Sequence, residues 1–105
     1  MTAIEDTFAF QLTANGIPFL REYKAIHGRK FRWDFYIPYF EDPGFLIEIQ
    51  GGIWHKGGHT SGLGVTRDCT KHNLAVLNGF RCLMFTSAMV QSGEAVNLVK
   101  EIIAC

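Results

Sequence analysis

Two carboxylates stand inside segments that otherwise have the composition of buried strands. Asp34 lies in the aromatic segment 31–37, and Glu48 lies in the apolar segment 45–50. A carboxylate in a buried strand carries a desolvation cost, so two of them separated by one short turn suggest a shared cation. A carboxylate-bound divalent cation can activate water and neutralise phosphate charge, so the pattern predicts a hydrolytic metal site. The alternative is an ordinary ion pair between Glu48 and Arg32 across the strands.

The spacing of these residues predicts that they meet. Alternation places Asp34 on the face opposite the apolar residues of its segment, which are Phe31, Trp33, Phe35 and Ile37. In the second segment Glu48 and Gln50 share one face, and Pro43 and Gly44 lie in the intervening turn. The two strands should therefore pair antiparallel, with Asp34 near the level of Glu48 and Gln50.

Two further residues could take part in this chemistry. Glu5 falls on the same stripe of a predicted first helix as Phe8 and Leu12, although it also completes a capping box with Thr2. His55 follows the second strand in a glycine-rich segment, where it could act as an acid, a base or a water-positioning group. It could equally be a solvent-exposed loop residue.

Basic residues supply candidate phosphate contacts. Arg67 and Lys71 are one helical turn apart on a predicted helix. Arg29, Lys30 and Lys56 could extend a basic track from there. Because the formal net charge is zero, contact with nucleic acid would depend on such a local patch. Asp68 and Lys71 could instead form a surface ion pair of little energetic value.

A zinc site is a rival interpretation of the same region. His55-x₃-His59 and Cys69-x₂-His72 have spacings compatible with tetrahedral zinc. The gap between the two pairs is glycine-rich, and pair spacing alone is unspecific. Zinc would make this a metal-stabilised interaction domain rather than an enzyme.

The elements that must position these residues alternate at short intervals. We expect a helix from Thr2 to Asn15-Gly16 and a first strand over 17–23, followed by the two carboxylate strands. The glycine-rich segment 51–64 should form no element. A second helix should start at Thr66 and stop at Asn78-Gly79. A fourth strand over 81–86 and a final helix capped by Ser92 complete the order, with Met84 and Met89 in the core. This order predicts an α/β fold with a mixed four-stranded sheet.

Length and composition limit the organisation of the chain. With 105 residues, of which 48% are hydrophobic, it can bury one core and has no room for two domains, so we expect one domain over 1–105. No apolar run approaches the roughly 20 residues that span a bilayer, and the N-terminus does not have the pattern of a signal peptide. The three widely spaced cysteines favour reduced thiols. We therefore expect no membrane partner and an intracellular, cytoplasmic location.

Taken together, the order of elements and Asp34, Glu48-x-Gln50 and Glu5 resemble the PD-(D/E)XK nuclease superfamily with its restriction-endonuclease-like αβββαβ core. The segment Gln50 to His55 is similar to Vsr-like (very-short-patch-repair) endonucleases. Asp68-x-x-Lys71 followed by Gly79-Phe80-Arg81 is similar to Vsr-like and small VRR-NUC proteins. The resemblance covers nearly the whole chain.

The resemblance implies a DNA endonuclease that uses Mg²⁺ or Mn²⁺. Its implied metal ligands are Asp34, Glu48, Glu5 and the Ile49 carbonyl, and its implied catalytic residues are Asp34, Glu48, Gln50 and His55. DNA is the implied partner. A homodimer is plausible, because one chain offers one site and cutting both strands at once would need two chains.

Three positions depart from the family patterns. Trp33 stands where proline usually precedes the aspartate, Gln50 replaces the signature lysine, and Gly52 stands where Vsr enzymes carry a zinc cysteine. A glutamine amide can hydrogen-bond but carries no charge for the transition state. The alternative function is therefore a nucleic-acid-binding module with a decayed nuclease site.

Overall fold

The first helix begins where the sequence predicts it. The computed structural model describes residues 2–38, 43–50 and 62–104, and in it α1 spans Ala3–Ala14. Thr2 caps this helix by accepting a hydrogen bond from the Glu5 backbone N–H at 3.2 Å. Phe8 and Leu12 are fully buried. The predicted cap and the inward stripe are therefore confirmed.

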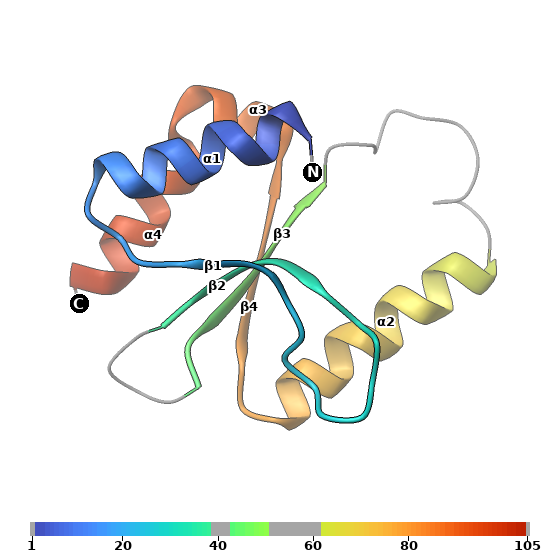
Figure 1. Cartoon of the computed structure of the whole chain (residues 1–105). Coiled ribbons are helices and arrows are strands. Elements are labelled where there is room, and N and C mark those ends of the chain that lie inside the picture. The colour runs from blue at the N-terminus through green and yellow to red at the C-terminus, as the bar shows by residue number, and fades with distance from the viewer. Residues whose placement is uncertain (1, 39–42, 51–61, 105) are drawn as a thin grey trace.

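A mixed four-stranded sheet forms the centre of the molecule (Figure 1). Its strands, in the spatial order β1-β2-β3-β4, are Leu20–Tyr23, Trp33–Ile37, Phe45–Gln50 and Arg81–Thr86. β2 runs antiparallel to both β1 and β3, and β4 runs parallel to β3. β1 is shorter than predicted, because Pro18 has no N–H to donate to a ladder.

Helices cover both faces of this sheet (Figure 1). α2, Gly62–Leu77, lies on one face, and α1, α3 (Ser87–Ser92) and α4 (Glu94–Ala104) lie on the other. The predicted α/β fold with a mixed four-stranded sheet is therefore confirmed. None of the described helices is both long and apolar enough to cross a membrane.

Two helix predictions need correction. α2 begins at Gly62, and the Thr66 hydroxyl donates to the Gly62 carbonyl at 2.8 Å, so Thr66 lies inside the helix and does not cap it. α3 was not predicted; Thr86 caps it by accepting from the Met89 N–H at 3.2 Å. The predicted end of α2 is confirmed, since Gly79 has a φ of +88°.

The core divides into two clusters, one on each face of the sheet. The larger cluster contains Phe8, Phe35, Ile47 and Val99, and the smaller one, toward α2, contains Ile26, Trp33, Leu46 and Ala75. We predicted that Trp33 shares a face with Phe35, which is wrong. The alternation is interrupted here because the neighbouring strand carries Glu22 at a φ of +51°, and because the β2–β3 register ends at Phe35↔Ile47.

The connection between β2 and β3 requires glycine at one described position. A Cβ added to Gly44 would collide with the Ile37 carbonyl. The Gly44 N–H donates to the Tyr36 hydroxyl at 3.2 Å, which fixes the entry into β3. The antiparallel pairing predicted from Pro43 and Gly44 is confirmed by the register Ile37↔Phe45. Residues 39–42 of this connection lie outside the described residues.

Candidate active site

A pocket of about 250 Å³ opens where α1, the start of β2, the end of β3 and α2 come together. Its acidic lining residues are Glu5, Asp34, Glu48 and Asp68. The predicted convergence of the two strand carboxylates is therefore present in the fold.

Asp34 is held at the point where β2 and β3 separate. The register between these strands ends at Phe35↔Ile47, and just beyond it the Ile49 N–H donates to Asp34 Oδ2 at 2.8 Å. The carboxylate thus takes the place of a backbone acceptor. Because Asp34 bonds with one oxygen to the backbone of β3, its second oxygen can serve another ligand. The bond also brings Ile49, which lines the pocket, beside Asp34.

Glu48 forms an ion pair with Lys71 of α2. The two side chains are 21% and 19% exposed, so this pair is far less solvated than a surface pair. The Lys71 amine also lies 4.8 Å from the centre of the Trp33 ring. Our alternative partner for Glu48, Arg32, is wrong, and so is the alternative pairing of Lys71 with Asp68. Neither could be settled from the sequence, because Lys71 reaches Glu48 only through the packing of α2 on the sheet.

The environment of Glu48 favours its protonated form. Its pKa is raised from 4.5 to about 7, chiefly by burial and also by the nearby Asp34 carboxylate, although the Lys71 amine acts in the opposite direction. Desolvation and the neighbouring carboxylate therefore outweigh the ion pair. A carboxyl group with this pKa is poised to change its charge near neutral pH, as groups at functional sites often are.

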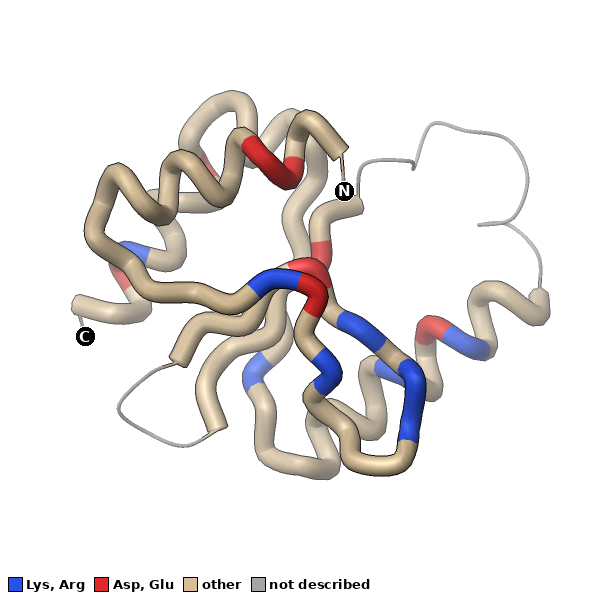
Figure 2. Tube along the Cα trace, viewed as in Figure 1, with Lys and Arg blue, Asp and Glu red and all other residues tan. Residues whose placement is uncertain are grey.

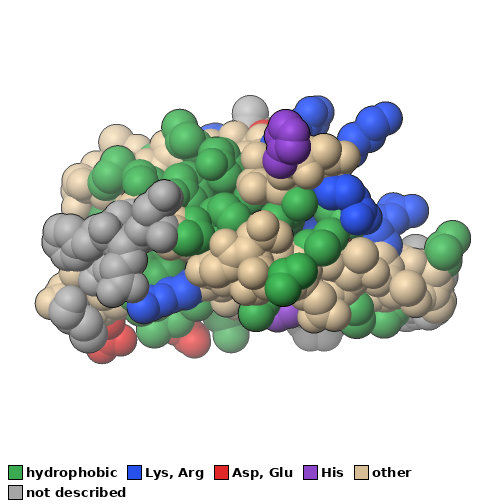
Figure 3. All heavy atoms as spheres, turned by 90° about the horizontal axis from the view of Figure 1, so that it is seen from below, with side chains coloured by type: hydrophobic (Ala, Val, Ile, Leu, Met, Phe, Trp, Pro, Cys, Tyr) green, Lys and Arg blue, Asp and Glu red, His purple; other side chains and the backbone are tan. Residues whose placement is uncertain are grey.

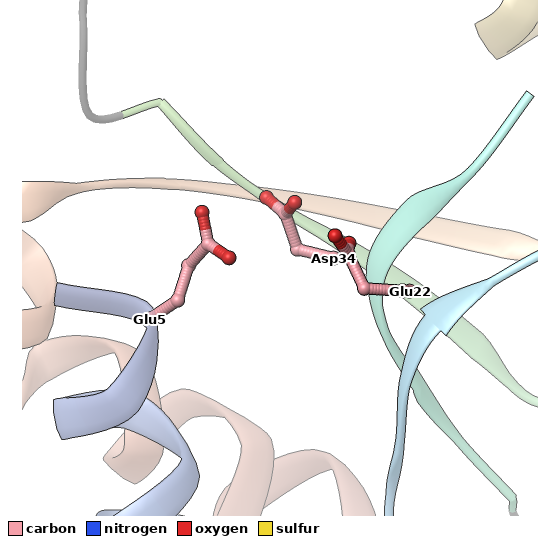
Figure 4. Close-up of side chains that lie close together, drawn as sticks. All are labelled: Glu5, Glu22 and Asp34. Atoms are coloured by element: carbon pink, nitrogen blue, oxygen red, sulfur yellow. The ribbon is translucent and has the colours of Figure 1, made fainter. Parts of the chain in front are cut away.

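A second cluster of carboxylates lies beside Asp34 (Figure 4). Glu5 of α1, Glu22 of β1 and Asp34 each offer an oxygen, and these oxygens lie within 4.8 Å of one another. Within the described part of the chain, this is the one group of three or more acidic, histidine or cysteine side chains close enough to hold an ion. Carboxylate oxygens are the donors that Mg²⁺ and Mn²⁺ prefer. The donor set therefore fits a hard divalent cation.

Glu22 is a site residue that the sequence analysis missed. Its φ of +51° places it in the left-handed region, which is costly for a residue with a Cβ. In a regular strand Glu22 would simply alternate with its neighbours, and nothing in the sequence of β1 predicts this conformation. The only available signal was that it is an acidic residue in a strand beside the Asp34 strand.

Glu5 combines the two roles that the sequence left open. Its backbone N–H is the group that Thr2 caps, and its side chain belongs to the carboxylate cluster. Burial raises the pKa of Glu5, and so does the charge of Asp34, while a hydrogen bond with Thr2 lowers it. Capping and a place in the cluster are compatible, because they use different atoms of one residue.

Gln50 and Met84 line the same pocket. The Gln50 amide donates to the Met84 sulfur at 3.8 Å, which is a weak interaction. We predicted that Met84 fills the core, and this is wrong, since it is 56% exposed. Met84 pairs with Glu48 in the parallel register, so its side chain lies on the face of the sheet where α2 leaves the pocket open. Met89 is partly buried against the main core, as predicted.

Basic segments lie next to the acidic ones. Figure 2 shows blue segments along the connection between β1 and β2 and on α2, close to the red segments of the strands. Arg29, Lys30 and Arg67 are exposed. The Arg29 guanidinium lies 4.8 Å from the centre of the Phe31 ring. In the view of Figure 3, Lys and Arg side chains gather at one end of the surface and project outward.

Several predicted residues cannot be placed. His55, Lys56 and His59 lie outside the described residues, as does the segment 51–61. Cys69 and His72 are exposed on α2, and no described group of ligands for a soft metal includes them. Cys82 lines the pocket, and burial raises the pKa of its thiol, which favours the protonated form.

The fold has a counterpart among solved structures. It is similar to the catalytic domain of the homing endonuclease I-Bth0305I, with a TM-score of 0.69 and 17% sequence identity over 96% of this chain and 92% of that one. No protein-family model matches the sequence. No curated protein matches it either. At this identity the likeness shows a shared fold.

Proposed function

We propose that this chain is a metal-dependent DNA endonuclease of the PD-(D/E)XK superfamily, related to Vsr-like and VRR-NUC enzymes. The observation that carries the proposal is the convergence of Glu5, Asp34 and Glu48 on one pocket. It occurs in a fold shared with a homing endonuclease catalytic domain. We take the chain to be one domain with one such site.

The proposed metal ligands are Asp34, Glu48, Glu5 and the Ile49 carbonyl, to which we add Glu22. Asp34 and Glu5 already offer oxygens to a common point, and Glu22 reaches the same point. A bound Mg²⁺ or Mn²⁺ would supply an activated water and neutralise charge on the phosphodiester. Three carboxylates this close repel one another, so a cation at this point would relieve that repulsion.

The remaining predicted residues have supporting roles in this proposal. Gln50 would orient water or a ligand through its amide, and His55 would act as an acid, a base or a water-positioning group. Arg67, Lys71, Arg29, Lys30 and Lys56 would contact phosphates of DNA. Cutting both strands at once would need two copies of the site, which is the reason for proposing a homodimer.

The second candidate function is a nucleic-acid-binding module that does not cleave. Two observations favour it. Glu48 already forms an ion pair with Lys71, and the Gln50 amide makes only a weak hydrogen bond to the Met84 sulfur. Both candidates predict binding to DNA. Only the nuclease predicts that product strands accumulate in the presence of a divalent cation.

The decisive experiment is a cleavage assay on supercoiled, linear, branched and single-stranded DNA in Mg²⁺, Mn²⁺ or EDTA. We expect cleavage by the parent protein with either metal and none in EDTA. Asp34→Ala and Glu48→Ala should abolish cleavage and keep the fold, with Glu101→Gln on the exposed side of α4 as the control. Wild-type cleavage by Glu48→Ala would show that the site is wrongly assigned. Binding without cleavage by the parent protein would favour the second candidate.

A further inference from the structure

One lysine that lines the pocket comes from a helix and not from a strand. Lys71 stands in the middle of α2, 23 residues from Glu48 in the sequence, and its side chain is only 19% exposed. Its amine is held between the Glu48 carboxylate and the face of Trp33. Removing a lysine amine from water is costly unless it is paired, so both partners are needed to keep it there.

The strand position that could have carried a positive charge does not carry one. Gln50 lines the same pocket with a neutral amide that contacts Met84. Among the described residues that line the pocket, Lys71 is the one with a lysine or arginine side chain. Any fixed positive charge that these residues supply to a bound phosphate therefore comes from α2 and not from β3.

We propose that Lys71 is a catalytic residue that exchanges partners, an inference that rests on the proposed nuclease function. Lys71 neutralises Glu48 until a divalent cation takes over that carboxylate. The released amine then pairs with a non-bridging oxygen of the scissile phosphate, whose negative charge develops during hydrolysis. No proton or bond changes hands in this exchange, because the amine remains an ammonium throughout.

The exchange has two consequences of opposite sign. Lys71 and a divalent cation compete for the same carboxylate, so removing the lysine charge should tighten cation binding. The same change removes the charge that stabilises the phosphate, so it should slow cleavage. A lysine with only a structural role would behave differently, because its loss would disturb the Glu48 environment and weaken cation binding, or leave cleavage unchanged.

The variant Lys71→Met separates these cases, because methionine keeps an unbranched apolar stem against Trp33 and removes the charge. Lys100→Met on α4 is the matched control, being an exposed helical lysine remote from the pocket. Calcium affinity is measured by titration calorimetry at several alkaline pH values, and the proteins are compared where the affinity no longer changes with pH. Cleavage is measured in single turnover at saturating Mg²⁺ and DNA.

We expect Lys71→Met to bind Ca²⁺ about threefold to tenfold more tightly than the parent protein. Its single-turnover cleavage should fall by roughly 10²-fold or more, the usual scale for a group that stabilises developing charge. Lys100→Met should change neither quantity. Adding Gln50→Lys to Lys71→Met should restore part of the cleavage, since it returns a positive charge to the same pocket. Lys71→Gln is a second charge-free variant should Lys71→Met fail to fold.

Weaker Ca²⁺ binding by both charge-free variants would overturn the exchange, and so would a wild-type cleavage rate. Failure of the proposed function gives a different result. If the parent protein cleaves no DNA in any metal, the phosphate role of Lys71 is lost together with the nuclease assignment. Tighter Ca²⁺ binding by Lys71→Met would still support competition between Lys71 and the cation at Glu48.

Discussion

The face of the sheet under α1, α3 and α4 is apolar, whereas the face toward α2 combines a smaller apolar cluster with a charged pocket. On the first face Phe8 packs edge-on against Phe35, with ring centres 5.1 Å apart. On the second, Trp33 lies beneath the Lys71 amine. Both faces are built from the same strands, so the difference comes from their alternating side chains, such as Ile47 and Glu48, and from what the helices add.

This difference suggests that the apolar face provides stability and that the pocket provides the chemistry. The apolar face follows the expected alternation, and Phe8, Phe35 and Ile47 on it are fully buried. The irregular features gather at the pocket: the left-handed Glu22, the displaced Trp33 and the raised pKa of Glu48. Strained or destabilised groups persist where the surrounding structure holds them in place, and they are common at functional sites. The apolar face would provide that support.

The largest effect should come from the apolar face. Phe8→Ala removes a fully buried ring and should lower the free energy of unfolding by about 3–5 kcal/mol, measured by urea denaturation. Phe10→Ala on the same helix is the control, because Phe10 is 73% exposed and its loss should cost less than about 0.5 kcal/mol. Equal losses for the two variants would contradict the division between the faces.

The pocket, unlike the apolar face, should make the stability of the protein depend on pH. Because the pKa of Glu48 is raised to about 7, its contribution to stability is complete below the ordinary pKa of 4.5 and is lost as the pH rises through 7. The stability of the parent protein, relative to Glu48→Gln, should therefore fall between those pH values when no divalent cation is present.

The matching measurement is cation affinity. Below the raised pKa, Glu48 must release a proton to bind Ca²⁺, so affinity should fall by about tenfold for each pH unit. Glu48→Gln should not show this dependence. An affinity that is independent of pH in the parent protein would remove Glu48 from the proposed ligands.

A smaller effect should come from the strained position at the edge of the pocket. Glu22→Gly relieves the left-handed strain, whereas Glu22→Ala removes the same charge and keeps the strain. We expect the glycine variant to be more stable than the alanine variant by about 1 kcal/mol, measured by urea denaturation. Both should weaken Ca²⁺ binding if Glu22 is a ligand. Equal stability of the two variants would mean that the left-handed conformation at this position carries no strain.

The smallest effect should come from the exposed basic residues. Arg67→Ala should weaken DNA binding in Ca²⁺ and reduce the slope of log affinity against log salt by about one unit, as expected for one lost phosphate contact. Lys100→Ala on α4 is the control and should leave the slope unchanged. An unchanged slope for Arg67→Ala would place DNA away from the start of α2.

The local pattern of the sequence was enough to predict most elements and the meeting of Asp34 with Glu48. Helix caps such as Thr2 and strands with period-two alternation depend on neighbouring residues, and a short turn leaves little freedom in how two strands pair. The same reasoning failed at Thr66, because residues 62–65 extend the helix past a residue that would otherwise cap it.

Only the tertiary structure decided which groups surround those two carboxylates. Lys71 reaches Glu48 because α2 packs on this face of the sheet beside β4, and Glu22 reaches Asp34 because β1 pairs with β2 and carries a left-handed residue there. Neither contact has a local signal, since each joins segments that are distant in sequence and positioned by the shared core. The sequence by itself determined the two strand carboxylates and the elements that carry them. The fold decided their counterion and their acidic neighbours, because those depend on how separate elements pack.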